Sequence, residues 1–167
     1  MSGPPADDTS APLASLSPDA LERMRTIGLR LDRAGRFWHD GHEVTHPRLH
    51  AALLRWLDVA ADGRAIVRLD PVRYAYVEVE AEHLRAVTAR WDGDRCLVTW
   101  DDGTEEELAY GQLVVGPDHA LLVPARGGRL RGRIAGAAYQ TVTTRIEERA
   151  ADHFVLVAAG AEHPRRA

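Results

Sequence analysis

The 167-residue sequence contains no lysine, and all 21 of its basic residues are arginines. Schiff-base catalysis and the phosphate-binding lysine of Walker loops both need a primary amine, so the sequence excludes both. Serine is confined to the N-terminal region, and none follows Ser17. The chain therefore offers no serine nucleophile beyond its N-terminal region, and several common classes of enzyme are removed from consideration.

Cysteine and long apolar runs are also scarce. Cys96 is the only cysteine, which excludes an intrachain disulfide and a zinc site built from several thiolates. It alternates with Val98 and Trp100 on one face of a predicted strand, so we expect a small buried apolar residue. No window approaches the roughly 18 apolar residues of a spanning helix. The acidic N-terminus lacks the basic start of a signal peptide, and together these features predict a cytoplasmic protein without a membrane partner.

The overall composition is that of a globular protein. Hydrophobic residues make up 45% of the chain and charged residues 28%, with a net charge of -4. A negative net charge argues against bulk binding of nucleic acid, which would need a local basic patch.

Local signals predict two N-terminal helices and a hairpin between them. Residues 1–16 are rich in Pro, Ser, Ala and Asp, and we expect a flexible tail. Ser17-Pro18 is typical of a helix start, here a helix through about Met24. Asp40-Gly41 predicts a two-residue hairpin turn, since both central residues of such a turn need positive φ.

A second helix is predicted from Pro47 onward. Its expected apolar stripe follows helical spacing and consists of Leu49, Leu53, Trp56 and Leu57, with His50 at the border of the core. The burial of Trp56 predicts that its replacement by Ala costs about 3 to 5 kcal/mol.

Most of the remaining chain predicts strands, followed by a helix over residues 137–149 and a strand over 153–158. The fold class is therefore α+β, with antiparallel strands, hairpins and two or three short helices. The stretch W-x-D-G occurs at residues 38–41 and again at 100–103, which indicates two related strand-hairpin-helix units that share one core. The predicted boundaries place these units at 17–88 and 89–160, with a C-terminal tail at 161–167.

Half of the eight histidines lie between residues 37 and 50, which raises the question of a metal site. In the predicted hairpin, His39 and His42 face each other across the strands, whereas His46 and His50 belong to the start of the next helix. A zinc site needs three or four ligands, and Glu43 points to the other strand face. We therefore predict no metal ligand here and no cofactor, and we keep a metal-dependent protein or small enzyme using His39 and His42 as the alternative.

A second candidate site is the arginine-rich stretch at residues 126–133. Alternation along a strand would place Arg129, Arg131 and Arg133 on one face, where they and Arg126 can bind a phosphate or carboxylate. The neighbouring Gly127-Gly128 would expose backbone amides to the same ligand. Ion pairing with the acidic residues of 101–107 is the competing interpretation and the one that we favour from the sequence.

With these elements in place, the chain resembles the bacterial family called domain of unknown function 1285 (DUF1285). The resemblance rests on R-L-D-R-A-G-R-F-W-H-D-G-H-E-V through L-L-R-W-L, on L-D-P-V-R-Y-A-Y-V-E-V-E, and on the C-terminal helix and strand. It covers about residues 26–160 and contains no catalytic motif. One departure stands at residues 81–84, where A-E-H-L replaces an acidic-Ala-Pro-Phe stretch, as in a divergent member.

The resemblance implies an α+β fold with repeated motifs and a signalling or ligand-binding role, and it transfers no catalytic residue. Taken together, the sequence predicts a small binding or interaction module without catalytic activity. Its partner would be a small anion or another protein, with Arg126, Arg129, Arg131 and Arg133 as the candidate binding residues. Homo-oligomerisation stays open.

Overall fold

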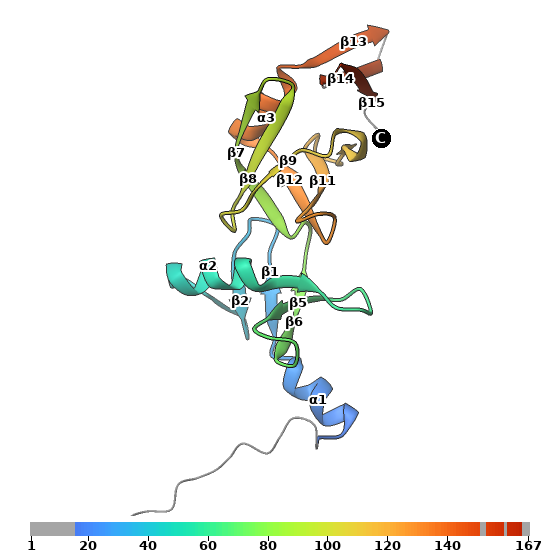
Figure 1. The fold of residues 1–167 in the computed structure, drawn as a ribbon. Coiled ribbons are helices and arrows are strands. Elements are labelled where there is room, and N and C mark those ends of the chain that lie inside the picture. The colour runs from blue at the N-terminus through green and yellow to red at the C-terminus, as the bar shows by residue number, and fades with distance from the viewer. Residues whose placement is uncertain (1–15, 151–152, 159, 165–167) are drawn as a thin grey trace, which may run out of the picture.

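The computed structural model describes residues 16–150, 153–158 and 160–164 (Figure 1). The predicted N-terminal tail therefore lies outside the described residues, except for Leu16. The described chain is arranged along one long axis. Helix α1 (Pro18–Arg25) lies at one end, two six-stranded sheets follow, and a three-stranded sheet lies at the other end. The predicted α+β class is confirmed.

Helix α1 begins as its sequence predicts. The Ser17 hydroxyl accepts a hydrogen bond from the backbone N–H of Ala20 at 3.3 Å, and Pro18 occupies the first helical position.

The first sheet combines two antiparallel groups of three strands, joined by one parallel pair. Its strands in chain order are β1 (Leu29–Leu31), β2 (Phe37–His39), β3 (His42–Glu43), β4 (Leu57–Val59), β5 (Ala65–Arg68) and β6 (Tyr74–Val79). Their order across the sheet is β3-β2-β1-β6-β5-β4, and β1 pairs with β6 in parallel. Helix α2 (Pro47–Trp56) connects β3 to β4.

The second sheet has the same construction. Its strands are β7 (Leu84–Asp92), β8 (Arg95–Trp100), β9 (Glu105–Glu107), β10 (Val114–Val115), β11 (Leu121–Ala125) and β12 (Leu130–Ile134). Their order is β10-β11-β12-β7-β8-β9, with β7 and β12 parallel. A three-residue 3₁₀ helix, η2 (Tyr110–Gln112), takes the place of α2 in the connection from β9 to β10.

The two sheets are topological copies of each other. Adding six to each strand number of the first sheet gives the strand order of the second. The two W-x-D-G stretches lie at the same topological position, between the second and third strands of each unit. Strand β7 runs across the boundary predicted between residues 88 and 89, and the division into domains stays a prediction.

The two W-x-D-G stretches nevertheless close different turns. Asp40 and Gly41 both have positive φ, 47° and 80°, and His39 pairs with His42, as predicted for a two-residue hairpin. In the second unit the Trp100 N–H donates to the Thr104 carbonyl at 2.8 Å, so that turn is longer. The sequence repeat marks an equivalent position and does not repeat the local backbone.

The C-terminal region differs from its prediction. Helix α3 (Gly136–Thr143) ends early, and the residues expected to continue it form β13 (Ile146–Ala150). Three threonine hydroxyls in the last turn bond to backbone carbonyls, which offers the chain an alternative to further helix. The third sheet then pairs β13 with β14 (His153–Ala158) and β14 with β15 (Ala161–Pro164). Part of the predicted tail is thus a strand, and residues 165–167 lie outside the described residues.

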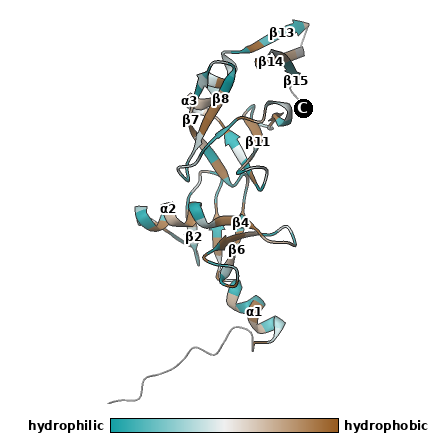
Figure 2. Ribbon diagram, in the orientation of Figure 1, coloured by the Kyte–Doolittle hydropathy of each residue, from teal (hydrophilic) through white to brown (hydrophobic). Residues whose placement is uncertain are grey.

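A single hydrophobic cluster contains residues of both six-stranded sheets, and hydrophobic residues concentrate in their strands (Figure 2). Cys96, Val98 and Trp100 are all buried on one face of β8, which confirms the predicted alternation. Among the described residues, no helix is both long enough and apolar enough to span a bilayer.

The predicted apolar stripe of α2 is partly wrong. Leu53, Leu54 and Leu57 are buried, but Leu49 is 45% exposed and Trp56 is 38% exposed. At 100° per residue the buried leucines share one face, and Trp56 lies to one side of it. The large cost predicted for Trp56→Ala therefore no longer applies, and Trp56 is available for another role.

Candidate functional site

The four predicted arginines separate into two pairs. Arg131 and Arg133 lie on β12, whereas Arg126 and Arg129 lie in the turn that precedes it. The Arg131 guanidinium donates to the Ala81 carbonyl at 3.1 Å, and Arg133 forms ion pairs with Asp118 and Glu82. Arg126 and Arg129 point away from Arg131 and Arg133 and contact the first sheet and its helix α2.

Arg126 joins the two sheets through a buried network. Its guanidinium donates to the Asp102 carboxylate at 2.7 and 2.5 Å, and to the carbonyls of Leu54 and Leu57 at 2.9 and 2.7 Å. These two carbonyls belong to the end of α2, where a helix leaves backbone acceptors unpaired. Burial raises the pKa of Asp102, but hydrogen bonds from Thr104 and Arg126 outweigh it and hold that pKa below its usual value.

Arg129 and Arg68 share one carboxylate. Arg129 Nη2 lies 2.5 and 2.6 Å from the two carboxylate oxygens of Asp58, and Arg68 Nε lies 3.1 Å from one of them. The side chain of Asp58 is 15% exposed and also accepts the backbone N–H of Val59. Two guanidinium groups from different sheets are thus held side by side by a single acid.

These side chains surround a hollow of about 160 Å³ at the meeting point of the two sheets. We call it the arginine hollow; it is lined by Arg55, Trp56, Leu57, Asp58, Arg68, Arg126, Arg129 and Leu130. Four of these residues are arginines and one is acidic. The side chain of Arg55, on the last turn of α2, has no ion pair or hydrogen bond with any other described residue.

Charge is unbalanced at the arginine hollow. The four guanidinium groups face two carboxylates, Asp58 inside the hollow and Asp102 behind Arg126. A third carboxylate, that of Glu106, accepts the backbone N–H groups of Arg126 and Gly127, so one positive charge remains. Planar guanidinium groups bind phosphate and carboxylate oxygens in pairs. The arrangement is therefore suited to a small anion.

The arginine-rich stretch of the sequence supplies two of the four arginines of this candidate site. Arg126 and Arg129 stand out because they lie in an arginine-rich stretch, but Arg55 and Arg68 are 58 or more residues away along the chain and have no local motif. Only the packing of α2 and β5 against the β11–β12 turn brings them together.

The clustered histidines have local structural contacts. His42 Nδ1 lies 3.0 Å from the Asp40 carbonyl, and His39 Nε2 lies 3.7 Å from the Asp40 carboxylate. His46 caps α2 by accepting the Leu49 N–H at 3.4 Å. Within the part of the chain that the structure describes, no group of three or more His, Cys, Asp or Glu side chains is placed to hold a metal ion.

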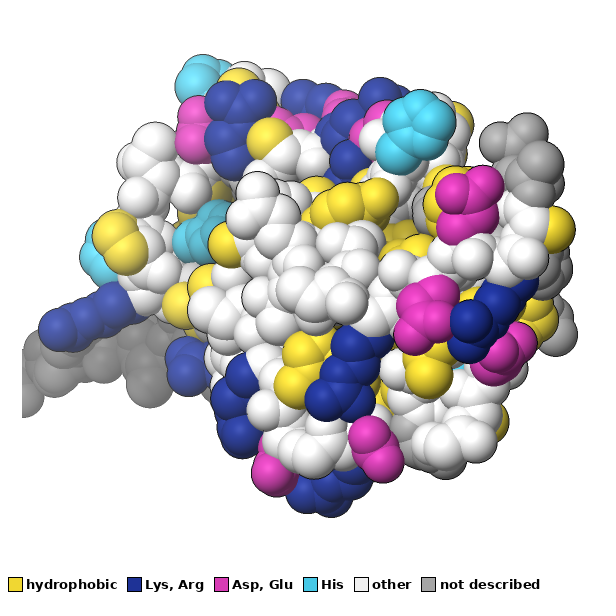
Figure 3. All heavy atoms as spheres, turned by 90° about the horizontal axis from the view of Figure 1, so that it is seen from above, with side chains coloured by type: hydrophobic (Ala, Val, Ile, Leu, Met, Phe, Trp, Pro, Cys, Tyr) yellow, Lys and Arg dark blue, Asp and Glu magenta, His cyan; other side chains and the backbone are white. Residues whose placement is uncertain are grey.

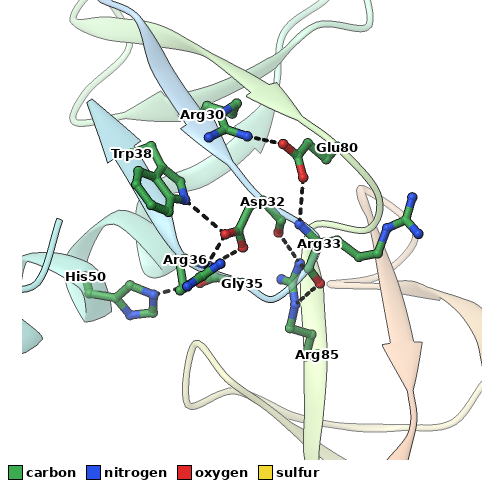
Figure 4. Close-up of polar contacts among 9 residues, drawn as sticks. All are labelled: Arg30, Asp32, Arg33, Gly35, Arg36, Trp38, His50, Glu80 and Arg85. Carbon is green, nitrogen blue, oxygen red and sulfur yellow. Dashed lines mark hydrogen bonds and ion pairs between the residues drawn. The ribbon is translucent and has the colours of Figure 1, made fainter. Parts of the chain in front are cut away.

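His50 has a different role, at the border of the core as predicted. Its Nε2 lies 2.8 Å from the Gly35 carbonyl, and its ring packs edge-on against Phe37 with 5.6 Å between centroids. It therefore anchors α2 to the β1–β2 turn (Figure 4).

The β1–β2 turn contains the other buried carboxylate, Asp32, which Figure 4 shows at the centre of its contacts. It accepts the backbone N–H and Nε of Arg36 and the indole N–H of Trp38, each at 2.9 Å. Burial raises the pKa of Asp32, but these three hydrogen bonds hold it well below its usual range. Arg85 of β7 donates to the carbonyls of Asp32 and Arg33 at 2.8 and 3.1 Å. The hydrogen bonds of this cluster hold the β1–β2 turn in place and attach it to β7 of the second sheet.

Basic and acidic side chains are interspersed on the face shown in Figure 3, which looks onto the C-terminal end of the molecule. That face has no extended surface of one sign of charge, as a binding surface for nucleic acid would require.

No family model matches the chain, and no curated protein sequence matches it. Two crystal structures are similar. A DUF1285 family protein from Silicibacter pomeroyi DSS-3 superposes with a TM-score of 0.67 at 20% identity, over 84% of this chain and 80% of that one. The fold is that of a DUF1285 family protein. A second such protein, from Shewanella baltica OS155, gives a TM-score of 0.58 at 19% identity, over 72% of this chain and 93% of that one.

The fold expected from the resemblance is thus confirmed, with the low identity of a divergent DUF1285-like chain. At this identity the likeness concerns the fold alone. Any function has to be argued from the residues of this chain.

Proposed function

We propose that the protein is a small binding module that takes a small anion in the arginine hollow and catalyses no reaction. The observation that carries the proposal is the convergence of Arg55, Arg68, Arg126 and Arg129 from α2, β5 and the β11–β12 turn. The remaining positive charge would attract an anion, and the preformed ion pairs reduce the entropy lost on binding.

The volume limits the ligand. Sites for drug-sized molecules usually measure about 300 to 1,000 Å³, so a hollow of about 160 Å³ fits an anionic group the size of phosphate or a small carboxylate. Such a group can belong to a metabolite or to the surface of a protein partner.

The test is titration calorimetry of the full chain with inorganic phosphate and with a small dicarboxylate, at low ionic strength. We expect saturable binding that Arg55→Gln and Arg129→Gln each weaken by about tenfold, as for loss of a charge-assisted hydrogen bond. Arg90→Gln is the matched control, since Arg90 is about as exposed as Arg129 and also pairs with one acid, Glu105. Equal binding by all four proteins would place the anion elsewhere.

The alternative, a metal-dependent protein or enzyme using His39 and His42, has weaker support. These two residues lie at a hairpin tip, and the nearby His46 is engaged as a helix cap. Elemental analysis of protein purified without a histidine tag would decide the matter, because stoichiometric metal that is lost on replacing both residues would favour this alternative.

A further inference from the structure

Trp56 differs from the other three tryptophans of the chain. The indole N–H groups of Trp38, Trp91 and Trp100 donate to Asp32, to the Thr141 carbonyl and to Glu106. The Trp56 indole has no hydrogen bond, ring contact or cation contact with any other described residue. Trp56 is also 38% exposed and lines the wall of the arginine hollow.

The neighbouring guanidinium groups limit the class of anion that the hollow favours. A phosphate monoester offers three acceptor oxygens and about -1.5 to -2 charges at pH 7, whereas a carboxylate offers two oxygens and one charge to the four guanidinium groups that line the hollow. The hollow holds the phosphoryl group but not a larger body, so the rest of such a ligand has to lie outside, against the wall.

We propose that the ligand is a phosphate monoester of a molecule with a planar aromatic or heteroaromatic ring, and that this ring stacks on Trp56. This inference rests on the proposed function, since the phosphoryl group occupies the arginine hollow. Stacking on an indole is tolerant of the identity of the ring because every such ring presents a π-face. The ring supplies affinity and the arginines supply selection for the anion.

The experiment compares four probes by calorimetry: inorganic phosphate, phenyl phosphate, cyclohexyl phosphate and phenol. We expect phenyl phosphate to bind about tenfold more tightly than inorganic phosphate, in line with the roughly 1 to 3 kcal/mol of one stacked ring. Cyclohexyl phosphate should gain less because its ring is not planar, and phenol should not bind measurably. Binding of phenyl phosphate should quench tryptophan fluorescence.

Three variants assign the effect to the ring or to the arginines. Trp56→Leu should bring the ratio of the phenyl phosphate affinity to the inorganic phosphate affinity close to one, and Trp56→Phe should restore most of the preference. Arg129→Gln should weaken both ligands. Inorganic phosphate that binds as well as phenyl phosphate would overturn the stacking inference and leave the proposed function intact, whereas no binding of any phosphate would overturn both. A preference that survives in Trp56→Leu would also overturn the inference.

A nucleoside monophosphate and a phosphotyrosine peptide present the same chemistry from two sources. Each is titrated in the same way, and the source that shows the larger dependence on Trp56 is the one that the site selects. Equal, Trp56-independent affinities for the two would contradict a ring-stacking site.

Discussion

The two six-stranded sheets have the same strand order but differ in the connection between their third and fourth strands. The first sheet places a ten-residue helix, α2, between its third and fourth strands, whereas the second has only the three-residue η2 at that position. Arg55 and Trp56 both lie at the end of α2. The candidate site therefore lies where the two copies differ, and the common framework serves to bring the ends of α2 and of the β11–β12 turn together.

The buried carboxylates show the same contrast. Asp32 in the first unit takes its side-chain hydrogen bonds from Arg36 and Trp38, at most six residues away. Asp102 in the second unit also accepts two local hydrogen bonds, from the backbone N–H and the hydroxyl of Thr104, but its cation is Arg126, 24 residues away, which also binds the end of α2. The first carboxylate stabilises a local turn, and the second stabilises the contact between the units.

The largest effect should come from breaking that contact. Arg126→Leu should cost about 3 to 5 kcal/mol in urea unfolding, because it leaves the fully buried Asp102 side chain without its cation. Arg36→Leu is the comparison in the first unit and should cost less than about 2 kcal/mol. Each carboxylate keeps two neutral donors, but the Arg36 side chain is 53% exposed, whereas Arg126 also donates to two carbonyls at the end of α2. Equal costs would contradict the claim that Asp102 stabilises the contact between the units and Asp32 only a local turn.

A smaller effect should follow from Gly132→Ala. A Cβ at this position would lie 2.3 to 2.9 Å from three ring atoms of Trp100, whose buried indole cannot move aside freely. Such overpacking costs about 1 to 3 kcal/mol. Gly111→Ala is the control, because a Cβ there meets nothing within 4 Å and φ is not positive. A melting temperature unchanged by Gly132→Ala would contradict the close approach of β12 to Trp100.

The connection between the sheets should respond to pH through His83. Burial, and then the charges of Arg131 and Arg85, lower the pKa of His83 to about 4, and its Nδ1 accepts the Arg131 N–H at 3.1 Å. Between pH 6.5 and pH 4 the unfolded chain therefore binds a proton that the folded chain does not, so this contribution to stability is present above pH 6.5 and is lost as the pH falls towards 4.

The lost contribution should be on the order of 1 to 2 kcal/mol, because the ring stays partly accessible to water. Urea unfolding at pH 7 and pH 4.5 measures it. The variant His83→Gln should show a smaller difference between the two pH values than the wild type; an undiminished difference would assign the pH dependence to other groups.

The smallest effect should come from the hairpin tip of the first unit. Replacing His39 and His42 together by Gln should change the free energy of unfolding by less than about 0.5 kcal/mol, because both are exposed. A larger loss of stability, or a change in bound metal, would show that the first unit contains a site of its own at the hairpin tip, which the account does not predict.

Local chemistry made part of this structure predictable. The cap at Ser17, the Asp40-Gly41 turn and the alternation of Cys96 with its neighbours depend on a few adjacent residues, and all three are confirmed. The face of α2 and the end of α3 depend on what packs or pairs with them, and there the predictions were wrong for Trp56 and for residues 146–149.

The candidate site follows the same division. Arg126 and Arg129 could be selected from one arginine-rich stretch, but their partners in the hollow come from α2 and β5. Arg131 and Arg133 belong to the same stretch but do not line the hollow. They lie on β12, whereas Arg126 and Arg129 lie in the β11–β12 turn. Sequence proximity cannot distinguish the two pairs, since tertiary contacts decide which arginines converge.

The most direct test of the arginine hollow is nuclear magnetic resonance of the arginine Nε–H groups during titration with phosphate. The 21 arginines report at once on where the anion binds. The account predicts saturable shifts in the signals of Arg55, Arg68, Arg126 and Arg129, with those of Arg131 and Arg133 unchanged. Shifts centred on Arg131 and Arg133, or small unsaturable shifts across many arginines, would contradict it.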